Sequence, residues 1–199
     1  MAFNLDNFRN TLQGGGARPT LFEMRLNLPA AVSQGRVAAA LSPFMVKVSE
    51  IPASTVGSIE VPYFGRKVKV AGDRTFANLT VTIINDENFA IRKALEEWMD
   101  RIAGHKSAES QFPGRNTDGG YVANQELVQY GRQGNPLRTY TFVGAFPVTL
   151  SAMAVDWNAE GTLQDFTCEF AYQWWEVNGQ IPTRDNGGVR VGIDINVGA

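Results

Sequence analysis

The sequence predicts a mainly β protein with half-buried antiparallel sheets and a single covering helix. Three observations carry this prediction. Short runs of strand-forming residues recur along the 199 residues, and 20 glycines punctuate them at short spacing. Several runs place apolar side chains on one face and polar side chains on the other, as sheets that cover a core do. One segment alone has the period of an amphipathic helix.

The chain is expected to divide into three parts. Residues 1–19 are polar and end in glycines, which predicts an N-terminal arm. The central domain is predicted at 20–176, since its length suits one core. Residues 177–199 form a C-terminal extension, in which 189–195 alternates as a strand does.

Within the central domain, composition separates strands from connections. Small residues predict a loop at 29–40, and the segment 71–74 has the composition of a turn. A polar loop is predicted at 105–123, and it is longer than a simple connector needs to be. The strands are predicted at 20–28, 44–48, 58–63, 66–70, 76–84, 125–130, 138–144, 148–155 and 163–174.

The helix is predicted over residues 86–103. Asn85 or Asp86 can cap its first turn, and Gly104 ends it. Its apolar residues form one stripe, while arginine, lysine and glutamate spaced i,i+4 occupy the opposite face. We interpret it as a surface helix that closes one side of the β core, with its tryptophan as a core residue. The stripe consists of Ile91, Leu95, Trp98 and Ile102.

The composition argues against catalysis. One histidine and one cysteine are too few for the common metal sites, which combine several such ligands. His105 is interpreted as an exposed residue past the helix end, and Cys168 as a small apolar filler on a strand face. The sequence contains no nucleophile elbow, phosphate loop or dinucleotide motif. We therefore expect no enzyme, no metal site and no cofactor.

The charge and hydropathy of the chain predict neither nucleic-acid binding nor membrane insertion. The formal net charge is −2, which gives no general attraction for phosphates. No apolar run approaches the roughly 18–20 residues that a membrane helix needs. The first residues lack the features of a secretory signal, so we expect a disulfide-free protein that is assembled in the cytosol.

Threonine is frequent on the polar faces of the predicted strands, whereas lysine and arginine are scarce there. In 79–83, three apolar side chains alternate with Thr80 and Thr82. The same alternation gives the polar pairs Thr139/Thr141 and Thr167/Glu169. Basic residues gather elsewhere, notably between the predicted strands 58–63 and 76–84 and along the helix. The pattern is typical of half-buried antiparallel sheets.

Several blocks, in the same order along the chain, resemble the tail tube proteins of contractile-tailed bacteriophages. The most specific block is 64–76, Phe-Gly-Arg-Lys-Val-Lys-Val-Ala-Gly-Asp-Arg-Thr-Phe, which runs into 79–87 and then into the helix. A further block at 17–22 precedes it. The C-terminal blocks are 155–157, 166–172 and 175–176.

The resemblance implies a β-barrel or sandwich of two packed antiparallel sheets with one flanking helix. It also implies hexameric rings that stack into a hollow tube inside a contractile sheath, through which DNA passes from capsid to host cell. The expected partners are further copies of the chain, the tail sheath protein, and the baseplate and tail terminator proteins. Double-stranded DNA would pass without specific binding. The expected location is the virion tail, after assembly in the bacterial host cytoplasm.

A conduit for DNA must not retain its cargo, and basic groups in its wall would bind phosphates. We therefore expect uncharged or acidic strand faces to line the lumen, and the sequence leaves open which of them turn inward. The lumen candidates are Thr80, Thr82, Thr139, Thr141, Thr167 and Glu169.

The hairpin-like segment 51–64 carries apolar residues with few evident core partners. In a free monomer such a segment would be an aggregation hazard, whereas a contact between subunits or rings would explain it. An ordinary hairpin packed on its own core is the alternative. The candidate contact residues are Val56, Ile59, Val61, Tyr63, Phe64, Arg66 and Lys67.

Two other functions stay open at this level. The tube of a contractile injection system or of a phage-tail-like bacteriocin has the same fold but no genome to conduct. A monomeric β-barrel that binds a small apolar ligand would need apolar residues on both strand faces. The threonine-rich faces argue against that barrel. The insertion at 29–41 and the extension at 177–199 exceed the shorter members of the family, and the sequence assigns them no role.

Overall fold

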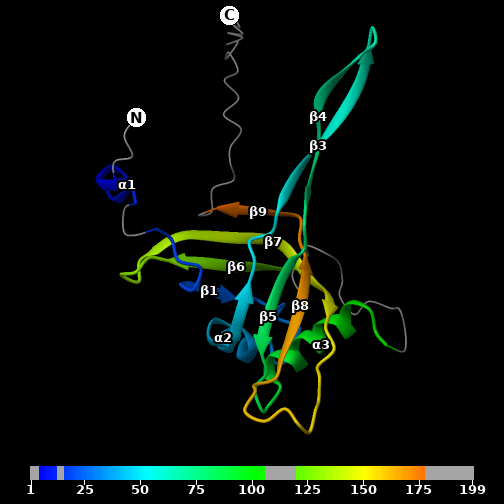
Figure 1. Cartoon of the computed structure of the whole chain (residues 1–199). Helices are drawn as coiled ribbons and strands as arrows, with labels where there is room; N and C mark the ends of the chain where they lie inside the picture. Colours follow the sequence, from blue (N-terminus) through cyan, green and yellow to red (C-terminus); the bar gives the residue numbers. More distant parts are fainter. Residues whose placement is uncertain (1–4, 13–15, 106–119, 178–199) are drawn as a thin grey trace, which may run out of the picture.

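Figure 1 shows the computed structural model, which describes residues 5–12, 16–105 and 120–177. Seven strands form one antiparallel sheet in the order β1-β6-β7-β8-β5-β2, with β9 paired to β7. The long strand β7 pairs first with β6 and β9 and then with β8, so it belongs to both halves of the sheet. The strands are β1 (Phe22–Arg25), β2 (Val46–Ser49), β5 (Leu79–Ile84), β6 (Ala123–Tyr130), β7 (Pro136–Leu150), β8 (Asp165–Ala171) and β9 (Trp174–Val177).

The expected mainly β fold with antiparallel sheets is confirmed, but the sheet does not close into a barrel. β1 and β2 lie at opposite ends of the strand order, and the described residues form no ladder between them. Helix α2 (Gly35–Met45) packs near this opening, against β1, β2 and β5. Helix α3 (Ala90–Ile102) lies beside α2 and also packs against β7 (Figure 1).

The core lies between the two halves of the sheet and the helices. In β5 the fully buried Leu79, Val81 and Ile83 alternate with half-buried side chains, among them both threonines, and β8 repeats this alternation. Trp98 of α3 is fully buried against Phe170, which confirms its expected place in the core. Cys168 is also buried there, as expected. The largest fully buried side chains include Trp98, Phe142, Phe166, Phe170, Met24 and Leu26.

Helix α3 begins later than the predicted residue 86. Residues 86–89 form a turn, in which the Phe89 N–H donates to the Asp86 carbonyl over 2.9 Å. Phe89 then takes a left-handed conformation (φ 55°) and the helix starts at Ala90. The Asp86 carboxylate nevertheless accepts the Ala90 N–H at 2.9 Å, so it satisfies a first-turn donor as a cap does.

The predicted loop at 29–40 is wrong for its second half, because α2 begins at Gly35 and continues into the predicted strand at 44–48. Its buried positions are Gly35, Ala38 and Ser42, which are small enough for close packing but leave no apolar stripe to detect. The Ser42 hydroxyl accepts the Leu26 N–H at 2.9 Å and ties α2 to the end of β1. A short helix, α1 (Leu5–Thr11), lies within the expected N-terminal arm.

Strands β3 (Ser54–Tyr63) and β4 (Arg66–Phe76) form a separate two-stranded sheet that projects from the body (Figure 1). The predicted turn at 71–74 is wrong: these residues continue β4 opposite an irregular register between Val56 and Ser58. Strand β7 contains the predicted strand at 138–144 and the first three residues of the one at 148–155, whose remaining residues form no strand. The predicted strand at 163–174 divides into β8 and β9.

Some sequence predictions fall outside the described residues. These are the strand at 189–195, nearly all of the extension 177–199 and most of the loop 105–123. Among the described helices, none is long and apolar enough to cross a membrane.

Candidate assembly surfaces

The β3–β4 hairpin exposes its side chains on both faces. Every residue of β3 is exposed, and so is nearly all of β4. A two-stranded hairpin is marginally stable by itself, and this one carries apolar side chains that no core residue covers. The alternative of a hairpin packed on its own core is therefore wrong for most of its length. All the predicted contact residues are exposed on it: Val56, Ile59, Val61, Tyr63, Phe64, Arg66 and Lys67.

The tip of the hairpin presents two aromatic rings. Phe64 and Gly65 connect the strands in a two-residue turn, and both have positive φ, 43° and 77°. The rings of Tyr63 and Phe64 meet edge to face with centroids 4.7 Å apart, and Phe64 is 92% exposed. Below the tip, Lys67 donates to the Glu60 carboxylate at 2.9 Å. The hairpin thus carries exposed apolar and charged side chains along its strands and two aromatic rings at its end.

Four of the predicted lumen residues lie together on the outer face of β5 and β8. Thr80 pairs with Glu169 and Thr82 with Thr167, and the two hydroxyl oxygens of Thr82 and Thr167 are 3.3 Å apart. Asp165 lies on the same face, where it binds Lys47 of the neighbouring β2 at 2.9 Å. The side chains of this face are therefore uncharged or acidic. The one lysine described beside it, Lys47, is paired with the Asp165 carboxylate.

Thr139 and Thr141 lie elsewhere, on the outer face of β6 and β7. Thr141 pairs with Glu126 on one side and with Glu176 of β9 on the other. Sequence reasoning therefore placed all six residues on polar faces, but the structure brings them together as two separate groups.

Sequence reasoning missed the charged residues that complete the second face. Arg25 of β1 pairs in register with Glu126 and binds Glu23 at 2.6 Å, while the Tyr130 hydroxyl donates to Glu23 at 2.7 Å. The hydrogen bond from Arg25, and then that from Tyr130, hold the pKa of Glu23 below its usual value. The arginine is thus neutralised within the face. Only the long-range register between β1, β6 and β7 reveals this group.

The described residues give no support for a catalytic or metal site. They contain no group of three or more His, Cys, Asp or Glu side chains placed to hold a metal ion. Burial raises the pKa of the Cys168 thiol, which keeps it protonated and unreactive. His105 is exposed and hydrogen-bonds Asp100 at 2.7 Å, which lowers the pKa of that carboxyl. The buried aromatic side chains occupy the interior that a ligand-binding barrel would need to leave open.

A family model described as "Phage tail tube protein" matches residues 17–178, and the chain belongs to this family. It is 29% identical to the tail tube protein gp19 of Enterobacteria phage T4 over 168 residues, which cover 82% of this chain and 93% of gp19. It is 28% identical to the tail tube protein of Serratia phage KSP90, covering 84% and 93%. The resemblance seen in the sequence is confirmed.

Solved structures share the fold at low sequence identity. One is an extracellular contractile injection system, the PVC sheath/tube terminator in its extended state, with a TM-score of 0.57 and 12% identity. It aligns over 81% of this chain and 96% of that chain. Another is the tube-terminating cap of the anti-feeding prophage, with a TM-score of 0.57, 13% identity, and 81% and 90% coverage.

Proposed function

We propose that this chain forms hexameric rings that stack into the hollow tube of a phage tail, inside a contractile sheath, and that DNA passes through the tube to the host cell. The observation that carries the proposal is the β3–β4 hairpin, which is exposed over its length and ends in two aromatic rings. Burial of these apolar side chains between copies would stabilise the assembly through the hydrophobic effect, because in the monomer the same side chains are exposed to water.

The two polar sheet faces support a role in conduction. The face of Thr80, Thr82, Thr167 and Glu169 carries no described basic group other than the paired Lys47 at its edge. A wall of this kind offers DNA phosphates few counterions to displace, so the cargo is not held. The face of Thr139 and Thr141 is acid-rich and its arginine is paired. We propose that at least one of the two faces lines the lumen.

The proposal includes partners and a location. The tube would contact the sheath protein along its length and the baseplate and terminator proteins at its ends. The subunit would be made in the bacterial cytoplasm and become part of the virion tail, with a purely structural and not an enzymatic role. The phage tail is favoured over an injection system or bacteriocin because the curated relatives cited above are phage proteins.

Negative-stain electron microscopy of the purified chain over a range of concentrations tests the assembly. Rings with an open bore, or stacked tubes, are the expected result. Where the chain alone stays monomeric, the same measurement with baseplate proteins added as an initiator must give tubes. A compact monomer under both conditions contradicts the proposal.

Two lysine variants test the lumen. Thr82→Lys and Thr141→Lys each place one new cation per subunit on one of the two faces. We expect the variant whose face lines the bore to retain short duplex DNA inside tubes, and this retention should weaken steeply with salt. If neither variant retains DNA in the bore while both assemble, the assignment of these faces to the lumen is wrong.

A further inference from the structure

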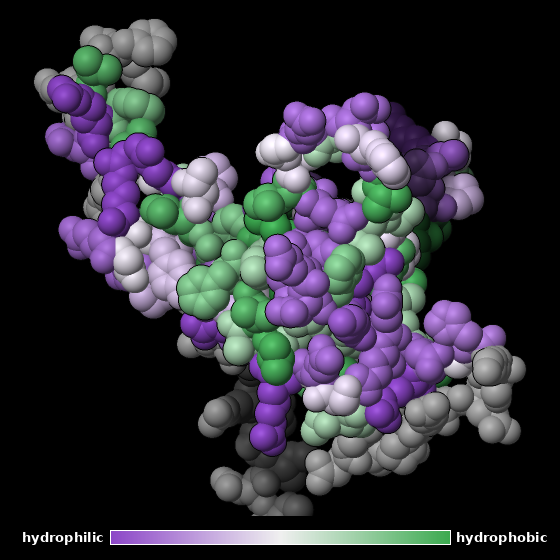
Figure 2. Space-filling view, turned by 90° about the horizontal axis from the view of Figure 1, so that it is seen from below, coloured by the Kyte–Doolittle hydropathy of each residue, from purple (hydrophilic) through white to green (hydrophobic). Residues whose placement is uncertain are grey.

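A second group of uncovered apolar side chains lies at the opposite end of the molecule from the hairpin tip. The connection between β7 and β8 (151–164) reaches the lower end of the view in Figure 1, while the hairpin reaches the upper end. Val155, Trp157 and Leu163 of this connection are 89%, 102% and 76% exposed. Seen from that end, the surface shows apolar patches among polar groups (Figure 2).

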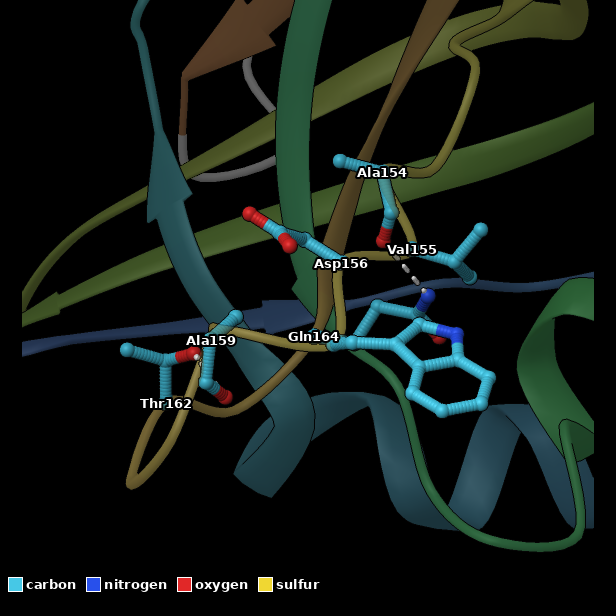
Figure 3. A pocket seen from close by; sticks show the side chains of 7 residues that line it. Ala154, Val155, Asp156, Ala159, Thr162 and Gln164 are labelled. Atoms are coloured by element: carbon cyan, nitrogen blue, oxygen red, sulfur yellow. Dashed lines mark hydrogen bonds between the residues drawn. The ribbon is translucent and has the colours of Figure 1, made fainter.

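The connection surrounds a shallow hollow of about 320 Å³. Figure 3 shows Ala154 and Gln164 joined by a hydrogen bond across it, from the Gln164 side-chain amide to the Ala154 carbonyl at 3.1 Å. The volume exceeds the roughly 150 Å³ cavity that accepts benzene, so one aromatic side chain can enter. The lining residues are Ala154, Val155, Asp156, Trp157, Ala159, Thr162 and Gln164.

The shape of the hollow is held by hydrogen bonds within the monomer. The Asp156 carboxylate accepts the Asn158 N–H at 2.9 Å, and its carbonyl accepts the Ala159 N–H at 3.2 Å. Gln164 also accepts the Asn85 side-chain amide at 2.9 Å, which anchors the connection to the end of β5. A partner would therefore meet a surface whose backbone is already arranged, which lowers the entropy cost of binding.

The two ends have opposite charge. The hairpin carries four basic and two acidic residues, whereas the connection carries two acidic residues and no lysine or arginine. Complementary charge of this kind orients an encounter between two surfaces. The basic residues of the hairpin are Arg66, Lys67, Lys69 and Arg74, and its acidic residues are Glu60 and Asp73. The acidic residues of the connection are Asp156 and Glu160.

The aromatic residue at the hairpin turn is itself unusual. A two-residue turn with positive φ at both positions favours asparagine, aspartate or glycine, yet Phe64 occupies the first of them. A residue with a bulky side chain is strained in this conformation, and such residues cluster at functional positions. A contact between the exposed Phe64 ring and a partner would offset the backbone strain at this turn.

We propose that the hairpin tip of one copy, led by Phe64, docks into the hollow beside Trp157 of a second copy of this chain in the next ring. The contact joins two different surfaces at opposite ends of the subunit, and a contact between two different surfaces generates a filament when its rotation does not close into a ring. With 10 residues, β3 extends about 33 Å, which suits a hairpin that bridges between rings. The inference rests on the proposed stacking function and names the surface that receives the hairpin.

Cross-linking between two single-cysteine variants tests the docking. Arg66→Cys lies beside the tip and Glu160→Cys on the rim of the hollow, so Phe64 and Trp157 stay intact. The native Cys168 is buried and does not compete. Tubes grown from an equal mixture of the two variants are treated with a short bis-maleimide. We expect a covalent dimer at least tenfold more abundant than in tubes that pair Arg66→Cys with Gln133→Cys in the β6–β7 turn.

The outcomes separate the two proposals. A 66–160 cross-link above the control supports the docking. Assembled tubes that give no such cross-link, or the same yield as the control, overturn the docking and leave the tube function standing. A wild-type chain that forms neither rings nor tubes, with or without baseplate proteins, overturns the tube function and the docking with it.

Discussion

The β5–β8 pair and the β3–β4 hairpin are both pairs of antiparallel strands, yet the first has one face buried in the core and the second is exposed to solvent. In β5 every second side chain is fully buried, and the helices and β7 complete the core around them. In β3 no side chain is buried, although Val56, Ile59 and Val61 are as apolar as their counterparts in β5. Apolar content alone therefore does not decide burial. A pair of strands buries its side chains only where another element packs on it, and no other element of the described monomer covers the hairpin.

The difference separates two kinds of sequence requirement. Side chains of β5 and β8 stabilise the monomer, so substitutions there should lower its free energy of unfolding. Side chains of the hairpin and of the connection around Trp157 should leave that free energy unchanged and act on assembly. Variants that change only one of these two quantities support this distinction, and variants that change both contradict it.

The largest expected effect is on the core. Trp98→Ala should lower the free energy of unfolding by about 3–5 kcal/mol, because it empties a fully buried site and removes the hydrogen bond from the indole N–H to the Tyr121 carbonyl. Denaturant unfolding of the unassembled protein measures the change. Trp157→Ala is the matched control, since this ring is fully exposed, and its change should stay within about 0.5 kcal/mol. Equal losses in the two variants would place Trp157 in the monomer core.

The next largest effect concerns assembly. Phe64→Asn removes the aromatic ring but keeps a residue that suits the left-handed turn, so the hairpin should persist. We expect a monomer at least as stable as the wild type and a rise of about 30-fold or more in the concentration needed for tubes, the effect of losing a contact worth about 2 kcal/mol. Sedimentation of tubes over a dilution series measures it. Val148→Asn, at a half-exposed site on β7, is the control, and tubes of Phe64→Asn at the wild-type concentration contradict the prediction.

A moderate effect is expected where α2 meets α3. Burial raises the pKa of Glu97, but hydrogen bonds from Ser33 and Arg101 outweigh this and leave the pKa below its usual value of 4.5. The carboxylate therefore contributes stability above about pH 4.5, and this contribution is lost as the pH falls through the lowered pKa.

Glu97→Gln should cost about 1 kcal/mol at pH 7, because the amide replaces a charged acceptor. Its difference from the wild type should shrink as the pH falls below 4.5. Unfolding curves between pH 3 and pH 7 measure both effects. Glu87→Gln, at an exposed position before α3, should show neither, and a difference that persists unchanged in acid contradicts the role given to the Glu97 charge.

The smallest effect concerns the charges at the two ends. Glu160→Lys should weaken assembly a few-fold, since exposed charge pairs contribute about 0.2–1 kcal/mol each, and the loss should be larger at low salt. Adding Arg66→Glu to the same chain exchanges the two charges and should restore assembly. Light scattering during polymerisation measures the rate and extent. A double variant weaker than either single variant contradicts the pairing of these ends.

Much of the fold was predictable because its signals are local. The period of two in 79–84 and 165–171 set which side chains face the core, and the structure confirms this at Leu79, Val81 and Phe170. The period of 3.6 set the core stripe of α3 in the same way, including Trp98. For the hairpin, the sequence left two alternatives, a contact between subunits or a hairpin packed on its own core, and the structure shows that its apolar residues are exposed.

Other features were decided by packing between distant segments. Helix α2 buries glycine, alanine and serine, and its place depends on the close approach of α3 and β1, which no local period reveals. The composition of 71–74 is that of a turn, but the ladder of the hairpin continues on both sides of this segment and pairs Ala71 with Ser58 and Arg74 with Val56. The grouping of Arg25, Glu126 and Thr141 likewise depends on the register of three strands far apart in the chain.

The apolar faces of the strands and of α3 can be identified without any tertiary information, because side-chain periodicity is a property of the local backbone. The sequence also determined the family, through blocks that the family model matches over 17–178. Only the tertiary structure decided that the hairpin tip and the Trp157 hollow lie at opposite ends of one subunit. That arrangement depends on how β4, β5 and β8 run through the sheet, and long-range strand pairing, not local composition, sets their course.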